Sequence, residues 1–586
     1  MERHVPGFSL GMRTASRVTS RESRDGLLCA LLFALCAFPA RAQSLRDTVE
    51  RYTVDRDALA RRYAVSYSPA RSARFRTFYT EWLSRVAAVP YEKLDVEGRI
   101  DWHLIDNGLR RELALLDQTD RRASQMRQFL PFADVITSLM ESRRRMETVK
   151  PREAASTLAA LTKSVDSARA KVESPAGRDT SRATRIVALR AAGQLGELRK
   201  TLDDWFAFYR GYDPAFTWWT LDPWRRADSS MIRYEKSIRR DIIGQKEGED
   251  EPIIGDPIGV DALKAELAFE LIPYSPEELL RIAEKEFAWC ETEMRRAARD
   301  MGLGEDWKAA VEKVKNTYVE PGQQVDLVRD LEKEAEQFVE SRNLITVPPL
   351  AKEVWRMEML SPERQKVSPF FLGGEILWVS YPTDEMTADD KLMSLRGNNP
   401  HFSRATVHHE LIPGHHLQGF MMDRYMPHRR EFSTPFWMEG WALYWEMRLW
   451  DLGFPRSPED RVGMLFWRSH RAARIIFSLR FHMGTMTPNE AIDLLVSRVG
   501  HERANATAEV RRSFNGSYPP LYQIAYMIGG LQFRALHKEL VTSGRMTEKA
   551  FHDTILQGGG IPIELVRARL MGTRLEKAWK PAWRFE

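Results

Sequence analysis

Apolar residues recur at helical spacing along most of the chain. Leu, Val, Ile and aromatic side chains occupy positions three and four apart, with Arg, Lys and Glu between them, as in helices that bury one face. Helices are predicted over residues 76–88, 99–116, 154–172, 182–211, 276–300, 460–482, 488–500 and 522–541. Breaks or loops are expected at Asp213-Pro214, Asp222-Pro223, residues 244–259 and Gly529-Gly530. The chain is therefore predicted to be mostly α-helical.

Two further stretches have distinct patterns. Residues 434–452, TPFWMEGWALYWEMRLWDL, predict an aromatic helix that Ser433 or Thr434 caps and that Pro435 begins. Residues 371–381, FLGGEILWVSY, combine a Gly pair with Ile, Trp, Val and Tyr and predict a β-strand. A short structural hairpin is the alternative for this second stretch.

The N-terminus has the features of a secretory signal peptide. Four arginines form a basic lead-in: Arg13, Arg17, Arg21 and Arg24. An apolar stretch over 27–38 follows, and Ala40-Arg41-Ala42 fits a cleavage site. We predict a signal peptide over residues 1–42, although an uncleaved anchor or a buried helix is the alternative and translation could begin at Met12. The rest divides by its motifs into an N-terminal helical region, 43–340, and a C-terminal region, 341–586.

Charge and cysteine content agree with export. The whole chain carries +5, but residues 1–42 hold six Lys/Arg and three Asp/Glu, which leaves +2 for the remainder. The sequence has no basic tract of the kind that binds nucleic acid. The apolar stretch over 27–38 is too short to span a membrane and no other apolar run reaches 18 residues, so neither nucleic acid nor membrane is an expected partner after cleavage. Cys29 and Cys36 would leave with the signal, and Cys290 alone cannot form an intrachain disulfide.

The most informative stretch is HHELIPGHHLQG, residues 408–419, with four His and one Glu within nine positions. It begins like the zinc-hydrolase helix H-E-x-x-H, but Pro413 stands where the second His belongs. In an undistorted helix a His six or seven residues later could not reach the same ion. Pro413 removes a helical hydrogen bond and Gly414 permits unusual dihedral angles, so we expect a bulge that brings a later His back. Ordinary surface or core histidines are the alternative.

A catalytic zinc site needs a third protein ligand and an open position. Glu439 is the best candidate, because a carboxylate in an apolar, aromatic helix is costly to bury without a cation. Glu446 lies two turns later on the same face and is the alternative ligand, or a partner of one. A salt bridge to Arg would also satisfy Glu439.

Together, HHELIPGHHLQ and the later EGWALYWE resemble the bacterial domain-of-unknown-function 885 family. The resemblance is specific over 404–446 and covers much of 370–541. The family is similar to helical gluzincin metallopeptidases, which implies that architecture with a small β element beside the metal helix. It also implies His409, His415 and Glu439 as zinc ligands and Glu410 as the general base. His416 is the alternative to His415, and Ser478 departs from the Asp that relatives often have there.

Several residues outside the ligand set are further candidates for the site. Tyr526 and His482 match weaker stretches of the family pattern and are candidate donors to a developing oxyanion. Gln418 could support the metal ligands or cap a turn, and Arg404 is expected at the surface, with pairing to a substrate carboxylate as the alternative. The strand over 371–381 could align an extended peptide.

These patterns predict an exported zinc-dependent peptidase with one Zn²⁺ per chain and a peptide as its substrate. The C-terminal region would be the catalytic part. Two alternatives remain open: a metal-dependent hydrolase of small amides or esters, and a non-catalytic helical binding protein with a degenerate site. Manganese, iron or cobalt could occupy the same ligands.

Overall fold

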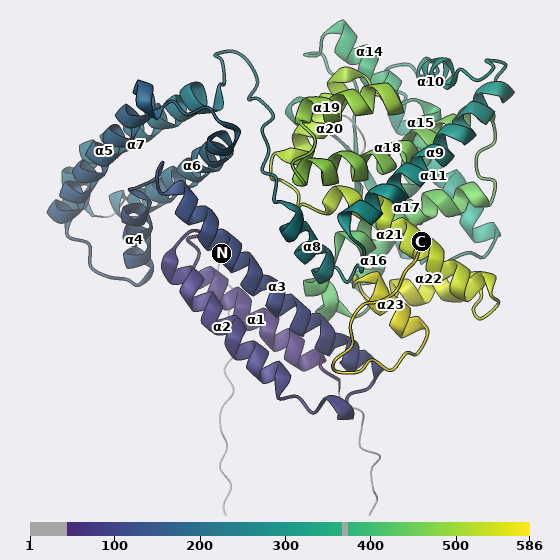
Figure 1. Cartoon of the computed structure of the whole chain (residues 1–586), viewed down its shortest axis with the longest axis horizontal. Coiled ribbons are helices and arrows are strands. Elements are labelled where there is room, and N and C mark those ends of the chain that lie inside the picture. The colour runs from purple at the N-terminus through teal and green to yellow at the C-terminus, as the bar shows by residue number, and fades with distance from the viewer. Residues whose placement is uncertain (1–43, 212, 366–372) are drawn as a thin grey trace, which may run out of the picture. The chain divides into compact units, whose positions relative to one another are not determined.

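The computed structural model describes residues 44–211, 213–365 and 373–586 and is mostly helical, as predicted (Figure 1). The expected signal peptide, and positions 371 and 372 of the expected strand, lie outside the described residues. The helix periodicity is confirmed along the chain, with ends that differ by several residues in places. No described helix is both long and apolar enough to cross a membrane.

The first helices form two cores of their own. Helices α1, α2 and α3 bury aromatic side chains such as Phe78 and Trp82 against one another, and α4 to α7 enclose a second core around Trp205. The elements of this part are α1 Arg46–Arg62, α2 Pro69–Ala87, η1 Tyr91–Lys93, α3 Val96–Met126, α4 Ala133–Arg144, α5 Pro151–Glu173, η2 Pro175–Gly177, α6 Arg182–Arg210, α7 Pro214–Ser237 and η3 Ile238–Ile243. The expected loop over 244–259 follows η3.

The break expected at Asp222-Pro223 is wrong, because Pro223 lies inside α7. A proline removes one helical hydrogen bond and disfavours helical dihedrals in the residue before it. Helix α7 nevertheless continues, since its buried face, including Phe216 and Met231, packs in the core around Trp205. The other proline turn is confirmed: Asp213 caps α7 by accepting a hydrogen bond from the backbone N–H of Phe216.

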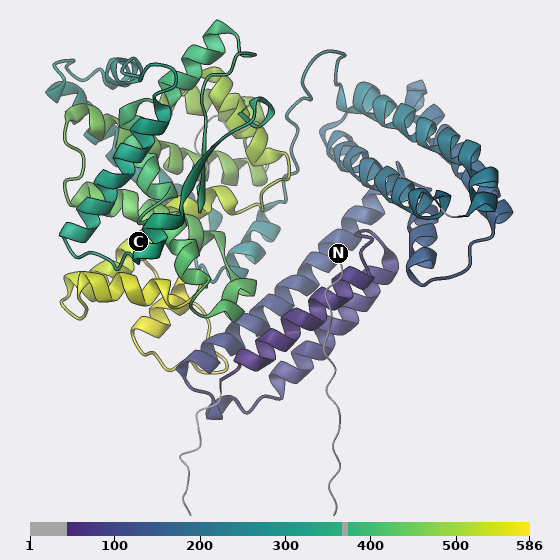
Figure 2. The ribbon, with the colours of Figure 1, turned by 180° about the vertical axis from the view of Figure 1, so that it is seen from behind.

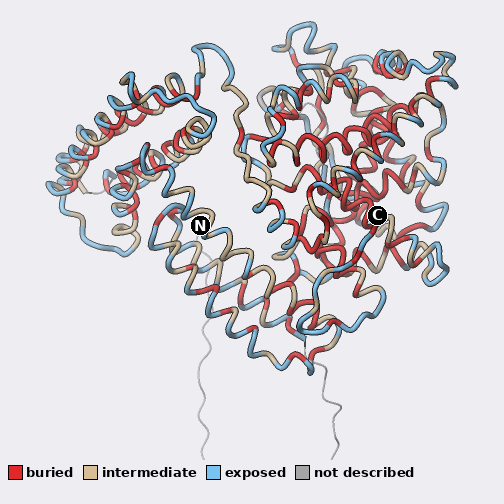
Figure 3. The backbone as a smooth tube through the Cα atoms, in the orientation of Figure 1, coloured by how far each residue is buried: buried red, intermediate tan, exposed pale blue. Residues whose placement is uncertain are grey.

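The largest core belongs to the helices that follow and includes side chains from Ile100 to Phe585, on both sides of position 340. Figure 3 shows that buried residues are concentrated in these helices. Its elements are α8 Val260–Phe269, α9 Pro276–Asp300, α10 Trp307–Lys315, α11 Gln324–Ser341, α12 Pro349–Val354, α13 Pro362–Gln365, α14 Ala388–Gly397, α15 Pro400–Glu410, α16 His415–Met422, η4 Pro427–Phe432, α17 Pro435–Asp451, α18 Pro458–His482, α19 Pro488–Leu494, η5 Leu495–Val499, α20 Arg503–Phe514, α21 Tyr522–His537, η6 Lys538–Thr542, α22 Glu548–Leu556 and α23 Ile563–Leu570.

The interruption expected at Gly529-Gly530 is also wrong, because α21 runs through both glycines. A Cβ built on Gly440 of α17 would lie 2.5 Å from the Cα of Gly529. The glycines therefore let α17 and α21 approach backbone to backbone. This contact fixes α17, which Thr434 caps, against the helix that carries Tyr526.

Two short strands lie beside this assembly (Figure 2). Strand β1, Arg356–Met359, pairs in parallel with β2, Ile376–Val379. Leu377 and Val379 of β2 pack on Val407 and Leu411, at the end of α15. The strand predicted over 371–381 is thus present in part and lies against the helix that carries His409, with a parallel partner in place of a hairpin.

Candidate metal centre

The metal motif is divided between two helices. Helix α15 ends at Glu410, four residues of irregular backbone follow, and α16 begins at His415. The expected Pro-Gly break is therefore present, but it does not take the form of a bulge in the helix. The chain ends one helix and starts another, which frees His415 from the helical spacing that would place it out of reach of His409.

The connection depends on Gly414. A Cβ at this position would lie 2.5 Å from the carbonyl oxygen of His408 and closer still to that of His409, so only glycine fits. The peptide bond before Pro413 is cis. The indole N–H of Trp441 donates to the carbonyl of Pro413 at 2.9 Å, and the N–H of Ile412 donates to Glu332 at 3.0 Å. Neighbouring helices thus hold the connection in place by satisfying its backbone groups.

His409, His415 and Glu439 meet at one point. One ligand atom from each lies within 4.8 Å of the other two. The Oε2 atom of Glu439 is 3.2 Å from Nε2 of His415 and 3.8 Å from Nε2 of His409. Ligands of a tetrahedral zinc ion, bound at about 2.0–2.1 Å, lie roughly 3.3 Å apart. The two separations that involve Glu439 lie within about half an ångström of this value, and the two imidazoles, whose ligand atoms lie within 4.8 Å of each other, would move closer by up to about 1.5 Å around a zinc ion.

Each proposed ligand has a partner that orients it. The Nδ1 atom of His409 lies 2.7 Å from Glu446, which leaves Nε2 to face the centre. Gln418 donates its amide to the carbonyl of Trp437 at 3.1 Å, so its oxygen can accept from His415 Nδ1 at 3.3 Å. The hydroxyl of Tyr522 donates to Oε1 of Glu439. Such partners fix imidazole tautomers and ligand direction in metal sites.

The other histidines of the motif point elsewhere. His408 is bonded through Nδ1 to the carbonyl of Arg404 at 2.9 Å, and burial lowers its pKa to about 4. His416 contacts the carbonyl of Ala351 at 2.6 Å through Nε2. The surface position expected for Arg404 is wrong, because this residue is buried and pairs with Glu334. These residues hold α15 and α16 in place and lie outside the ligand set.

The electrostatics of the metal-free site favour a cation. Burial alone would lower the pKa of His415, but the Glu439 carboxylate outweighs it and raises that pKa to about 9. Burial likewise opposes the charge on Glu439, and the imidazoles of His415 and His409 hold its pKa well below the usual range. Without a metal, a proton on His415 supplies the positive charge that Glu439 requires. Burial also raises the pKa of the Glu410 carboxyl group, since the buried site disfavours its charged form.

These groups line a cavity of about 350 Å³ that also includes Tyr526. The ring of Tyr526 stacks on that of His409, with centroids 6.2 Å apart. Gly373, just before β2, covers Glu410 so closely that a Cβ there would collide with the Glu410 carboxylate. The two glycines that precede β2, Gly373 and Gly374, thus border the cavity beside the candidate base.

The structure does not bring His482 to this cavity. Helix α18 lines the cavity with Trp467, Arg471 and Arg474, and His482 lies at the far end of the helix, roughly 12 Å beyond Arg474 at 1.5 Å per residue. His482 lines a larger cavity of about 590 Å³, where burial lowers its pKa to about 4. Its expected place beside the metal is therefore wrong.

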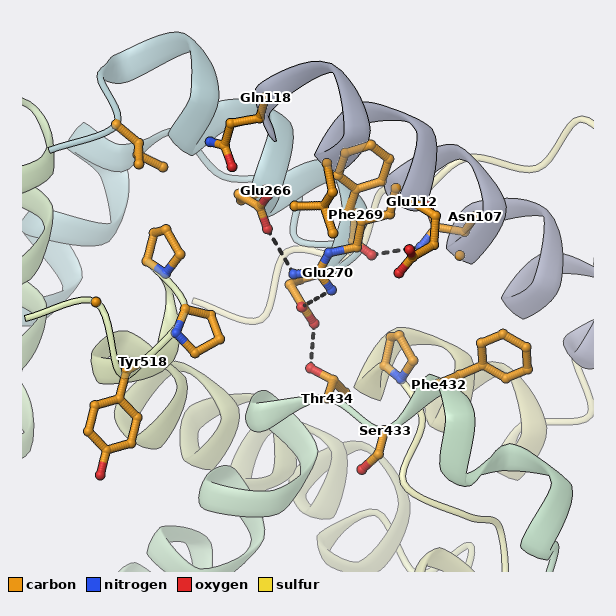
Figure 4. Close-up of a pocket in the computed structure, with 18 of the residues that line it drawn as sticks. Asn107, Glu112, Gln118, Glu266, Phe269, Glu270, Phe432, Ser433, Thr434 and Tyr518 are labelled. Carbon is orange, nitrogen blue, oxygen red and sulfur yellow. Dashed lines mark hydrogen bonds and ion pairs between the residues drawn. The ribbon is translucent and has the colours of Figure 1, made fainter. Parts of the chain in front are cut away.

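Figure 4 shows this larger cavity, whose lining includes Glu112, Glu266 and Glu270; the hydroxyl of Thr434 donates a hydrogen bond to Glu270. Tyr518 lines both cavities. Among the residues that the structure describes, the convergent ligand set lies in the smaller cavity, so the candidate chemistry belongs there.

Sequence reasoning missed three kinds of contributor to the site: Tyr522, Gly373 and a group of arginines on α18 and α20. Tyr522 lies one turn before Tyr526 on α21, so helical spacing could have placed both on one face. No local signal marks the others, because their roles depend on contacts between distant segments.

Comparisons with known proteins agree with this architecture. The chain is similar in structure to a protein from Shewanella oneidensis described as a "putative lipoprotein of unknown function" (TM-score 0.67, 18% identity, covering 90% of this chain and 100% of that one). It is also similar to a "putative lipoprotein" from Colwellia psychrerythraea (TM-score 0.57, 15% identity, covering 90% and 97%). No curated protein matches. The family described as "Bacterial protein of unknown function (DUF885)" matches residues 54–570, nearly the whole chain, which confirms the resemblance noted in the sequence. The chain therefore belongs to the DUF885 family.

Proposed function

We propose that this protein is an exported zinc-dependent peptidase with a gluzincin-like site. The observation that carries the proposal is the convergence of His409, His415 and Glu439 in one cavity with Glu410. Two imidazoles and a carboxylate are a ligand set of catalytic zinc. A bound zinc ion lowers the pKa of water and polarises a carbonyl group.

Each residue around the ion would have its own role in the reaction. Glu410 takes a proton from the attacking water as the new C–O bond forms, and passes it to the amine nitrogen as the C–N bond breaks. Tyr526, in the same cavity, is a candidate donor to the oxygen that gains negative charge. Within the described residues β2 has one unpaired edge, so this strand and the glycines before it can align an extended peptide.

Export is part of the proposal. The predicted signal peptide supports it, and the two similar structures are both described as putative lipoproteins. The likeness to those proteins is one of fold, and the sequence features of residues 1–42 carry the argument.

The test is Glu410→Gln. This variant keeps the shape of the side chain but cannot take a proton, so hydrolysis of a peptide library should be lost while about one zinc per chain remains. Zinc content serves as the control for folding. Wild-type turnover by Glu410→Gln would contradict the assignment of Glu410 as the general base. A zinc-loaded wild-type protein that cleaves no peptide would contradict the proposed peptidase activity.

A further inference from the structure

Three arginines line the metal cavity: Arg471 and Arg474 of α18 and Arg512 of α20. The guanidinium groups of Arg471 and Arg474 lie 4.6 and 4.5 Å from the ring centroid of Tyr526, whose ring stacks on His409. Arg512 lies 5.3 Å from the ring of Tyr518. The cluster is therefore next to the candidate metal centre.

These three guanidinium groups form ion pairs with only two carboxylates among the described residues, Glu509 and Glu446. Glu509 accepts from Arg474 at 2.7 Å and pairs with Arg512 at 3.1 Å. Within the described part of the chain, the carboxylate that pairs with Arg471 is Glu446, at 3.4 Å, and that carboxylate also pairs with His409 at 2.7 Å. Among the described residues, the buried atoms Nε of Arg471 and Nη1 of Arg474 have no hydrogen-bond partner.

The remaining carboxylates of the cavity do not correct this imbalance. Glu410 and Glu439 carry two negative charges, which a divalent ion would balance. His470, which also faces the cluster, stays neutral, because burial and then the nearby arginines hold its pKa well below the ordinary value. Arg471 and Arg474 are only 5% and 3% exposed. Burying an excess guanidinium is costly without an anion, so the cluster lacks one negative group.

We propose that this arginine cluster binds the free C-terminal carboxylate of the peptide substrate, which would make the enzyme a carboxypeptidase in its specificity. The inference rests on the proposed function for its substrate class. Guanidinium groups recognise carboxylates through paired, charge-assisted hydrogen bonds. A carboxylate there would supply the missing charge within reach of the residues that would cleave the chain.

The experiment compares one blocked tetrapeptide of alanine and phenylalanine with either a C-terminal carboxylate or a C-terminal carboxamide. Zinc-loaded wild-type protein should cleave the free acid with a kcat/KM roughly tenfold to a hundredfold higher than the amide, the range expected for a charge-assisted hydrogen bond. Calorimetry with metal-free protein should show the same preference in binding. Equal affinity for acid and amide would overturn the proposal.

A pair of neighbouring substitutions locates the effect. Arg512→Gln should raise KM for the free acid and reduce its advantage over the amide. Arg511→Gln is the matched control, because Arg511 bonds to the carbonyl of Glu251 at 2.6 Å and does not line the cavity. An unchanged acid preference in Arg512→Gln would overturn the assignment to this cluster. If neither peptide is cleaved, the proposed peptidase fails, and the binding measurement still decides whether a carboxylate site exists.

Discussion

Replacing Gly414 by alanine should disable the metal centre, because the connection between α15 and α16 has no room for a side chain at this position. The new Cβ would lie 2.5 Å from the His408 carbonyl oxygen, whereas real Cβ atoms essentially never approach within 3.0 Å. The backbone must therefore move by at least half an ångström at the residue before His415. Metal–ligand distances tolerate only about 0.2 Å.

We expect Gly414→Ala to weaken zinc binding at least roughly a hundredfold and to lower the free energy of unfolding by about 1–3 kcal/mol. Zinc affinity is measured by competition with a chromogenic chelator, and stability by urea unfolding of the metal-free protein. Gly419→Ala is the matched control, since it lies on α16 and a Cβ there meets nothing within 4 Å. Wild-type zinc affinity in Gly414→Ala would refute this account of the connection.

Other experiments separate ligands from neighbours. Glu446→Gln removes the negative charge that orients the imidazole of His409, and it should weaken zinc binding roughly tenfold to a hundredfold in the same competition assay. Unchanged zinc affinity would show that Glu446 does not orient a ligand. His415→Ala should lose zinc and His416→Ala should keep it, and the reverse order would overturn the ligand choice. Glu439 raises the pKa of His415 to about 9 in the metal-free protein. The stabilisation that this ion pair gives the fold is therefore fully present below pH 6.5, the ordinary pKa of histidine, and disappears as the pH rises through 9. Zinc binding at pH 7 should therefore release about one proton, measured by calorimetry in buffers of different ionisation heat, and no release would show that His415 is already neutral.

Helix periodicity and the motif predicted most of what lies close together in the sequence. The amphipathic patterns predicted the helices, and the pairing of HHELIPGHH with a later Glu predicted the group that the structure brings together. Helix periodicity depends on residues within a few turns of one another, and the later Glu, 30 residues after His409, is marked by the aromatic helix around it, so a single sequence carries both features. The choice of His415 over His416 came from the family pattern; in the structure His415 lies beside His409 and Glu439, whereas His416 contacts the carbonyl of Ala351.

The errors share a cause in long-range packing. Pro223 stays helical because the core around it favours the continuous helix α7, and Gly529-Gly530 serves a backbone contact with Gly440. Local propensity predicts the opposite at both places. His482 matched a family position, but it lies at the far end of α18 from the residues of this helix that line the cavity with His409 and His415. The arginine cluster joins α18 and α20 through Glu509, a contact that only the folded chain makes.

The measurement that tests the central claim most directly is the metal content per chain, by plasma mass spectrometry, of mature protein purified without a His tag or chelator. The account predicts about one zinc per chain. Protein that remains metal-free after dialysis against micromolar zinc would contradict it, because His409, His415 and Glu439 would then meet for a structural reason alone.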